Sequence, residues 1–260
     1  MRSEGNVALS RRQLLILSAG AVAFRPWSVR AETPSVASIR ELVRAGIERD
    51  LSGAVTRVFD LDPSLSGEVL LRATKADALP DGYAPRDVVS AAGNGIPSAG
   101  RQVIRSIIVD DTRALLQEAA AAGHNLYVGS GFRSQSYQVD IFAAQVARWG
   151  DEETANRYSA RPGHSQHQLG TTVDFTNDFR TFRGSGAPDW LRENAHRFGF
   201  VLPYTPTASD RTGYIDEPWH GRWVGRMLAG RLQSGGYQEW TDVDVDDVVA
   251  MLRTEASLDG

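Results

Sequence analysis

The sequence predicts an α+β fold in which helices pack on a small antiparallel sheet. Apolar residues at helical spacing occur mainly early in the chain, and short apolar runs typical of strands occur mainly late. The two kinds of segment do not alternate regularly, which argues against a doubly wound parallel sheet. Of the 260 residues, 42% are hydrophobic and 23% are charged, as in an ordinary soluble globular protein.

Six segments are expected to form helices. Over residues 104–122, apolar side chains recur near helical spacing, and Gly123 is suited to the end of that helix. In the next helix, Tyr137, Ile141 and Ala144 should form the apolar face. The complete set of expected helices is 38–50, 104–122, 135–149, 189–199, 223–232 and 243–253.

Strands are expected mainly in the second half of the domain. Residues 125–131 and 171–175 are typical of buried strands, the second with an Asp inside it, and residues 200–204 are typical of a further strand. Residues 60–100 are rich in Pro, Gly, Asp and Ala. We expect this segment to wrap around the domain with little regular structure, apart from a possible strand over residues 69–72.

The N-terminus has the three-part pattern of a secretory signal. Arg11 and Arg12 stand directly before an apolar stretch over residues 14–24, and Val-Arg-Ala at 29–31 places small residues at the positions that a signal peptidase reads. The paired arginines resemble a twin-arginine (Tat) signal. We expect residues 1–31 to be removed during export across the cytoplasmic membrane, into the periplasm or cell-wall space. The apolar stretch is shorter than the ~20 residues of a membrane-spanning helix, so we expect no stable membrane span afterwards.

The rest of the chain is expected to form one main domain with an extension at each end. Residues 32–60 are predicted to be a linker and an N-terminal helix, residues 61–235 the main domain, and residues 236–260 a helical appendage. We expect a monomer.

Composition excludes several kinds of site. The chain has no Cys, so disulfides, thiolate metal sites and Cys nucleophiles are excluded, and any metal must be held by His, Asp or Glu. Only five His are available. Residues 32–260 contain 23 basic and 31 acidic residues, and this acidic balance argues against nucleic-acid binding.

Two short segments combine histidines with acids. His167 and Asp174 stand on either side of a glycine turn, and His220 could supply a third ligand from a distant segment. Two His and one carboxylate with an open fourth position are typical of catalytic zinc. Glu217, three residues before His220, could face a metal-activated water without being a ligand and take its proton. Taken alone, His167 and Asp174 could equally form a buried His–Asp hydrogen bond.

The same residues carry a resemblance to a known family. The pattern Ser-x-His-x-x-Gly-x-x-x-Asp occupies residues 165–174, and Glu-x-Trp-His occupies residues 217–220. Together they resemble the zinc D-alanyl-D-alanine carboxypeptidases of the VanY type, peptidase family M15 (M15B). Ser-Gly-Phe-Arg-Ser at residues 130–134, followed by Gln138, resembles a further segment of that family. The resemblance runs from about residue 79 to residue 225.

The resemblance implies both a fold and a set of functional residues. The fold would be of the hedgehog/DD-peptidase type, with residues 61–235 as the catalytic domain. One zinc ion would be held by His167, Asp174 and His220, with Glu217 as the catalytic base. Arg133 would face the substrate carboxylate or the oxyanion. The substrate-binding residues would be Arg133, Gln138, Ser165 and Trp219.

Some of these roles have structural alternatives. Gln138 and Ser165 could instead cap local backbone groups. Trp219 could either line the pocket or fix the His220 segment as part of the core.

The implied activity is hydrolysis of the C-terminal D-alanyl-D-alanine bond of peptidoglycan stem peptides, with release of D-alanine. The same zinc site would serve an L,D-carboxypeptidase or a D,D-dipeptidase, although a dipeptidase needs a closed pocket. A non-catalytic, zinc-stabilised cell-wall-binding module is the alternative from another class, and Glu217 argues against it because a structural site has no use for a base. Wall remodelling and antibiotic resistance both remain open as the purpose.

Overall fold

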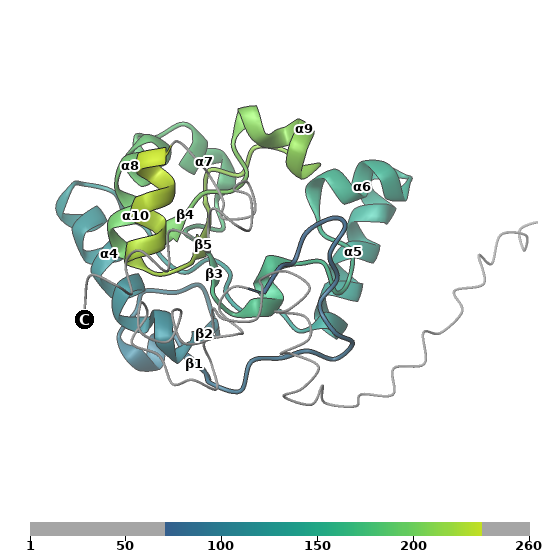
Figure 1. The fold of residues 1–260 in the computed structure, drawn as a ribbon, viewed down its shortest axis with the longest axis horizontal. Helices are drawn as coiled ribbons and strands as arrows, with labels where there is room; N and C mark the ends of the chain where they lie inside the picture. The colour runs from purple at the N-terminus through teal and green to yellow at the C-terminus, as the bar shows by residue number, and fades with distance from the viewer. Residues whose placement is uncertain (1–70, 236–260) are drawn as a thin grey trace, which may run out of the picture. The chain divides into compact units, whose positions relative to one another are not determined.

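The computed structural model describes residues 71–235 (Figure 1). The expected signal over 1–31, the linker and helix over 32–60, residues 61–70 and the appendage over 236–260 lie outside the described residues. Within residues 71–235, helices accompany two small antiparallel sheets, so the predicted α+β class is confirmed. None of the helices in this part of the chain is long and apolar enough to cross a membrane.

The first sheet is a two-stranded hairpin that the sequence did not indicate. β1 (Val88–Ser90) pairs antiparallel with β2 (Val103–Arg105), and α4 (Val109–Ala121) follows after a short 3-10 turn. The prediction that a helix begins at residue 104 is therefore wrong. Arg105 is fully buried, and its Nε donates a hydrogen bond to Asp87 Oδ1 at 2.8 Å. This ion pair favours the strand at a place where local spacing suggested a helix.

α5 (Gln135–Trp149) has the predicted bounds. The Ser134 hydroxyl accepts the backbone N–H of Tyr137 at 3.1 Å, and Gly150 ends the helix at a φ of 85°. The predicted apolar face is wrong, because Tyr137 is 57% exposed and the buried side chains are Gln138 and Phe142.

A second helix, α6 (Glu152–Tyr158), packs on α5 and was not predicted. The Asp151 carboxylate caps it by accepting the backbone N–H of Thr154 at 2.7 Å. The two helices lie on the opposite side of the main sheet from α4 (Figure 1).

The main sheet has three short antiparallel strands in the order β3-β5-β4. β3 (Thr172–Asp174) and β4 (Phe200–Val201) confirm two predicted strands in shorter form. β5 (His220–Trp223) is the central strand, and its last residue, Trp223, was predicted to begin a helix. The helix α10 (Arg226–Gly235) begins only after Gly225, whose φ is 84°.

The segment expected to be a strand over 125–131 is extended but makes only two isolated bridges. Val128 pairs with Ser98 in parallel, and Ser130 pairs with Asp174 antiparallel. A Cβ on Gly129 would lie 2.1 Å from the Thr176 carbonyl oxygen, so glycine allows the backbones to approach closely here. The bridge to Asp174 places the following loop beside the main sheet.

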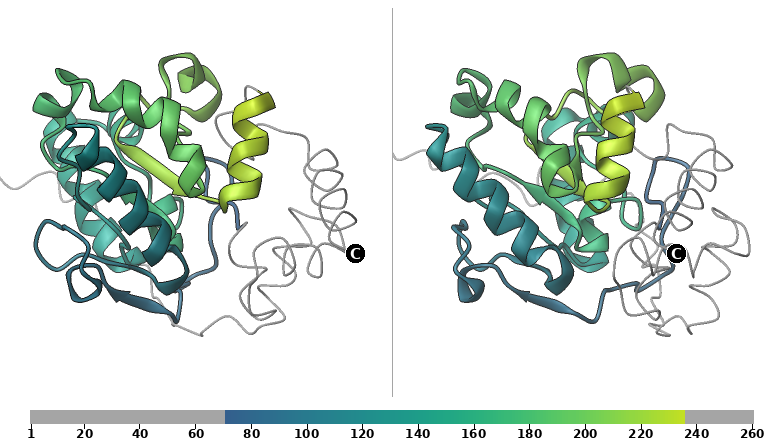
Figure 2. Two further views of the ribbon diagram at one scale, coloured as in Figure 1. Left: turned by 90° about the vertical axis from the view of Figure 1, so that its left-hand side faces the viewer. Right: turned by 60° about the vertical axis from the view of Figure 1, so that its left-hand side comes forward.

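The hydrophobic core lies between the main sheet and the helices α4, α8 (Ala187–Asn194) and α10, which Figures 1 and 2 show together. A 3-10 turn over Ala195–Phe198 continues α8, so the predicted helix over 189–199 is confirmed as a mixed element that starts two residues earlier. The remaining short helices are α7 (Phe179–Arg183) and α9 (Ser209–Thr212). A second cluster of buried hydrophobic residues packs the first described residues against the turn that carries His167. It comprises Leu71, Ala73, Leu79, Tyr83 and Leu169.

Candidate active site

His167 lies on a 3-10 turn (Gln166–Leu169) that ends at Gly170, where φ is 70°. Its Nδ1 is 2.8 Å from the carbonyl oxygen of Gly131, and this acceptor makes Nδ1 the protonated nitrogen. The other nitrogen, Nε2, is thereby left as a lone-pair donor and lies 3.3 Å from Asp174 Oδ2. A backbone carbonyl behind a histidine is the usual way of orienting a metal ligand.

Asp174 and His220 are opposite each other in the β3–β5 register. His220 Nδ1 lies 3.2 Å from Asp174 Oδ1. On the far side of the ring, His220 Nε2 is 3.0 Å from Gln166 Oε1, which accepts its proton. Both histidines therefore turn one nitrogen toward Asp174 and bond the other to a protein acceptor.

The three side chains form a compact, buried ligand set. One potential ligand atom from each of His167, Asp174 and His220 lies within 4.8 Å of the others, and each residue is 3% exposed. Asp174 Oδ1 is buried without a hydrogen-bond partner. A buried carboxylate oxygen in that state is costly unless a cation is beside it, so the set fits a divalent metal with nitrogen and oxygen ligands. The predicted ligands are brought together.

The protonation states suit such a site. Burial alone would raise the pKa of Asp174, but the His167, His220 and Arg133 side chains around the carboxylate favour its charged form and hold that pKa well below its usual range. Burial lowers the pKa of His220 to about 4. A charged carboxylate beside a neutral imidazole is the form in which these groups bind a metal.

Glu217 lies beside the cluster without belonging to it. Its backbone N–H donates to the Tyr204 carbonyl at 2.8 Å, and its own carbonyl accepts the His220 N–H at 3.0 Å, so a tight turn holds it next to β5. Glu217 Oε2 is 3.7 Å from His220 Nδ1. Burial, followed by the negative charge of Asp174, raises the pKa of Glu217 to about 8. A carboxyl group with a pKa near neutrality can both accept and donate a proton.

Arg133 connects the loop after Ser130 to the ligand set. Its Nε donates to Ser130 Oγ and its Nη2 donates to Asp174 Oδ2, both at 3.0 Å. The side chain is 20% exposed and lines the cleft. It can therefore orient Asp174 while the rest of the guanidinium faces the cleft.

A cleft of about 430 Å³ opens over the cluster. Ser165 and Trp219, both predicted to bind substrate, line it. Trp219 is 8% exposed, packs against Phe179 with ring centroids 4.3 Å apart, and has the Arg183 guanidinium 4.7 Å from its ring. Trp219 is thus both a wall of the cleft and part of the core, so the two alternatives that the sequence left open for it both apply.

The structure does not bring Gln138 into the cleft. Its side chain is 1% exposed, and its Nε2 donates to Ser159 Oγ at 3.0 Å and to the Ala160 carbonyl at 2.8 Å. Ser159 and Ala160 themselves line the cleft. Gln138 therefore supports the cleft wall from behind.

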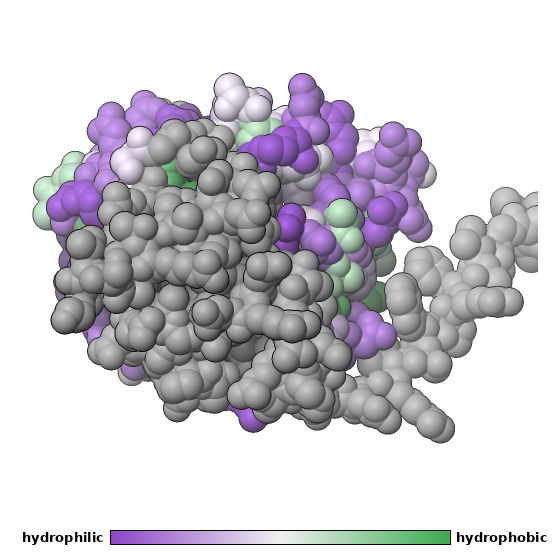
Figure 3. Space-filling view, in the orientation of Figure 1, coloured by the Kyte–Doolittle hydropathy of each residue, from purple (hydrophilic) through white to green (hydrophobic). Residues whose placement is uncertain are grey.

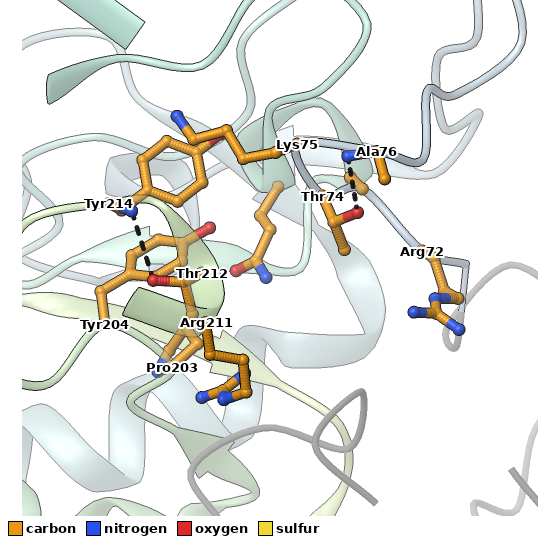
Figure 4. Close-up of a pocket in the computed structure, with 11 residues that line it drawn as sticks. Arg72, Thr74, Lys75, Ala76, Pro203, Tyr204, Arg211, Thr212 and Tyr214 are labelled. Carbon is orange, nitrogen blue, oxygen red and sulfur yellow. Dashed lines mark hydrogen bonds between the residues drawn. The ribbon is translucent and has the colours of Figure 1, made fainter. Parts of the chain in front are cut away.

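Sequence reasoning missed a group of residues next to the ligand set. Lys75, Tyr204, Tyr214 and Gln166 line a pocket of about 210 Å³, where the Lys75 ammonium lies 3.3 Å from the centre of the Tyr214 ring (Figure 4). Lys75 also bonds to Asn156 of α6, and burial lowers its pKa to about 7. Gln166 directly precedes His167 in the sequence, and this neighbouring position could have indicated that it belongs to the site. The contacts of Lys75, Tyr204 and Tyr214 join segments far apart in the sequence, so no local sequence pattern indicated them.

Gly131→Ala is expected to destabilise the fold and to weaken metal binding. A Cβ at Gly131 would lie 2.2 Å from the Val103 carbonyl oxygen, so the backbone that holds the His167 acceptor must move. We expect the free energy of unfolding to fall by about 1–3 kcal/mol in chemical denaturation. Gly230→Ala is the matched control, because its Cβ would meet nothing within 4 Å. Equal stability of the two variants would contradict this prediction.

Comparison with known proteins identifies the family of this chain. A family model described as "VanY: D-alanyl-D-alanine carboxypeptidase" matches residues 101–226. The solved structure of the LdcB LD-carboxypeptidase is 30% identical, and the match covers 65% of this chain and 83% of that one with a TM-score of 0.58. The chain belongs to the VanY family. The resemblance to VanY-type M15 peptidases seen in the sequence motifs is confirmed.

Other VanY relatives extend the comparison. The structure of a mutant of the vancomycin-resistance D,D-pentapeptidase VanY in complex with Zn(II) is 28% identical, covers 65% of this chain and 96% of that one, and has a TM-score of 0.56. A D-alanyl-D-alanine carboxypeptidase of Enterococcus faecalis is 35% identical over 130 residues, which are 47% of this chain and 48% of the relative. The chain spans 63% and 48% of the length of two curated relatives that it matches.

Proposed function

We propose that this VanY-family chain is a zinc metallopeptidase that hydrolyses the C-terminal D-alanyl-D-alanine bond of peptidoglycan stem peptides and releases D-alanine. The observation that carries the proposal is the convergence of His167, Asp174 and His220 beside Glu217, a carboxyl group held close to the ligands without joining them. A purely structural metal site would have no use for that group. The names of the relatives support a carboxypeptidase acting on D-Ala-D-Ala or on peptidoglycan peptides.

His167, Asp174 and His220 would hold one zinc ion. Zinc bound there would supply Lewis-acid activation of water and of the peptide carbonyl. The protein contributes the orientation of its ligands, because the Gly131 carbonyl fixes the His167 tautomer and Gln166 fixes that of His220. The Arg133 hydrogen bond to Asp174 completes this outer support.

Glu217 would act as the proton carrier. Its carboxylate takes a proton from the attacking water as the carbon–oxygen bond forms. It then gives that proton to the amine nitrogen of the departing D-alanine as the carbon–nitrogen bond breaks. Arg133 presents a partly exposed guanidinium on the same cleft wall and would stabilise either the developing oxyanion or the terminal carboxylate. The expected export signal in residues 1–31 agrees with a substrate outside the cytoplasmic membrane.

The proposal is tested by mass spectrometry of the products formed from stem pentapeptide, stem tetrapeptide and free D-Ala-D-Ala. We expect the pentapeptide to lose one D-alanine, and we expect activity to disappear with a chelator and to return with zinc. Loss of D-alanine only from the tetrapeptide would instead identify an L,D-carboxypeptidase, the activity named for LdcB. Cleavage of the free dipeptide alone would identify a dipeptidase. No cleavage by folded, zinc-loaded protein would contradict the proposal.

A further inference from the structure

The cleft continues beyond the metal ligands along one face of α5. Tyr137, Ile141, Gln145 and Arg148 all line it. They stand at positions i, i+4, i+8 and i+11, which share one side of a helix. At 1.5 Å per residue, this row is about 16 Å long, the reach of four to five extended residues at ~3.3 Å each. The cleft is thus much longer than a dipeptide.

Exposed aromatic side chains are concentrated at this part of the cleft. Tyr137 on α5 is 57% exposed and lines the cleft. Trp149 is 36% exposed and stacks on Tyr158, another lining residue, with ring centroids 4.2 Å apart. On the face shown in Figure 3, the described surface is mostly hydrophilic. Exposed apolar groups gathered in one place indicate a binding surface.

The two ends of the cleft differ in charge. Its acidic lining residues, Asp174 and Glu217, belong to the metal end. Arg133 is also there, bonded to Asp174. At the far end stands Arg148, whose guanidinium lies 5.2 Å from the centre of the Trp149 ring. Within residues 71–235, no carboxylate lies within ion-pair distance of it. The far end therefore offers a cation supported by an aromatic ring and suited to a carboxylate.

The geometry points to a distal subsite for the acyl part of the substrate. We propose that α5 binds the peptide on the amino side of the scissile bond, with Tyr137 and Ile141 contacting its apolar surfaces and Arg148 binding a carboxylate on it. This inference rests on the proposed function, because a carboxypeptidase releases one residue and only the acyl side of its substrate is long. A stem peptide supplies such a carboxylate at its γ-linked D-glutamate.

The test uses two pentapeptides that differ only in this group, one with γ-linked D-glutamate and one with D-isoglutamine, whose carboxylate is an amide. We expect the zinc-loaded full chain to show about tenfold higher kcat/KM for the carboxylate peptide, mainly through KM. Arg148→Gln should make the two peptides equal. Arg157→Gln, which removes an exposed arginine of α6 that does not line the cleft, should keep the preference.

A second comparison tests the apolar part of the subsite. Tyr137→Ala should lower kcat/KM for the pentapeptide several-fold and leave that for N-acetyl-D-Ala-D-Ala unchanged, because the short substrate does not reach α5. Equal effects on both substrates would overturn the assignment of Tyr137.

Binding measurements separate this inference from the proposed function. Calorimetric titration of zinc-loaded Glu217→Gln protein with each pentapeptide measures affinity without turnover, and we expect the same tenfold preference. Equal affinities for the two peptides, no binding of either, or a preference that survives Arg148→Gln would overturn the distal subsite. A preference in binding without cleavage by the parent protein would contradict the proposed function and leave the subsite standing.

Discussion

Glu217→Gln is expected to lower kcat for stem-peptide hydrolysis by about 10²–10⁴-fold while zinc remains bound. The amide has nearly the same shape as the carboxylate but cannot accept a proton from water. Because Glu217 lies outside the ligand set, zinc content should stay at the parental level. Steady-state kinetics together with metal analysis of the same samples measures both quantities.

Glu193→Gln is the matched control for this change, since Glu193 is an exposed residue of α8 outside the cleft. It should retain parental activity. If Glu217→Gln kept zinc and lost less than tenfold in kcat, another group would have to carry the proton, and the role assigned to Glu217 would be wrong.

Asp174→Asn is expected to lower zinc affinity by more than a hundredfold and to abolish activity at limiting zinc. Loss of groups that merely support ligands already costs 10–100-fold, so loss of the single anionic ligand should cost more. The amide also leaves the Arg133 guanidinium without its carboxylate partner. Competition with a chromogenic chelator gives the zinc dissociation constant of the variant and of the parent.

Asp140→Asn serves as the control, because Asp140 is exposed on α5 and does not line the cleft. It should bind zinc as the parent does. Parental zinc affinity in Asp174→Asn would show that the metal is held elsewhere. Circular dichroism of both variants distinguishes loss of the ligand from loss of the fold.

Local signals were sufficient for some elements and absent for others. The bounds of α5 follow from Ser134, which caps its first turn, and Gly150, which ends it in a left-handed conformation. Both signals are local in sequence, so the two ends could be predicted. β5 could not be predicted in the same way, because His-Gly-Arg-Trp has no alternating pattern of its own. It becomes a strand by pairing with β3 on one side and β4 on the other. The helix predicted from residue 104 failed for the same reason, since its first residues pair with β1.

The metal ligands and Glu217 could be predicted from residue types and from the order of the two motifs. The position of a residue within a motif was a weaker guide to its role. The three ligands and Glu217 carry chemistry that few other side chains supply, so two short motifs were enough to find them. Gln138 shows the limit of this reasoning: its motif position suggested a substrate contact, whereas its amide bonds to Ser159 and Ala160 behind the cleft wall. Lys75 could not be found, because its contact with Tyr214 is created by tertiary packing.

The pairing of Asp174 with His220 across β3 and β5 also determines when the active site can exist. Because neighbouring strand residues point to opposite faces, a slip of one residue would turn the His220 imidazole away from Asp174. Metal binding therefore reports whether the central strand has joined the sheet in the correct alignment. β5 is also the last strand of the described chain, so during synthesis the ligand set stays incomplete until residues 217–223 have emerged and paired. A chain shortened before this strand would contain both α5 and His167 and still lack the third residue of the ligand set, His220.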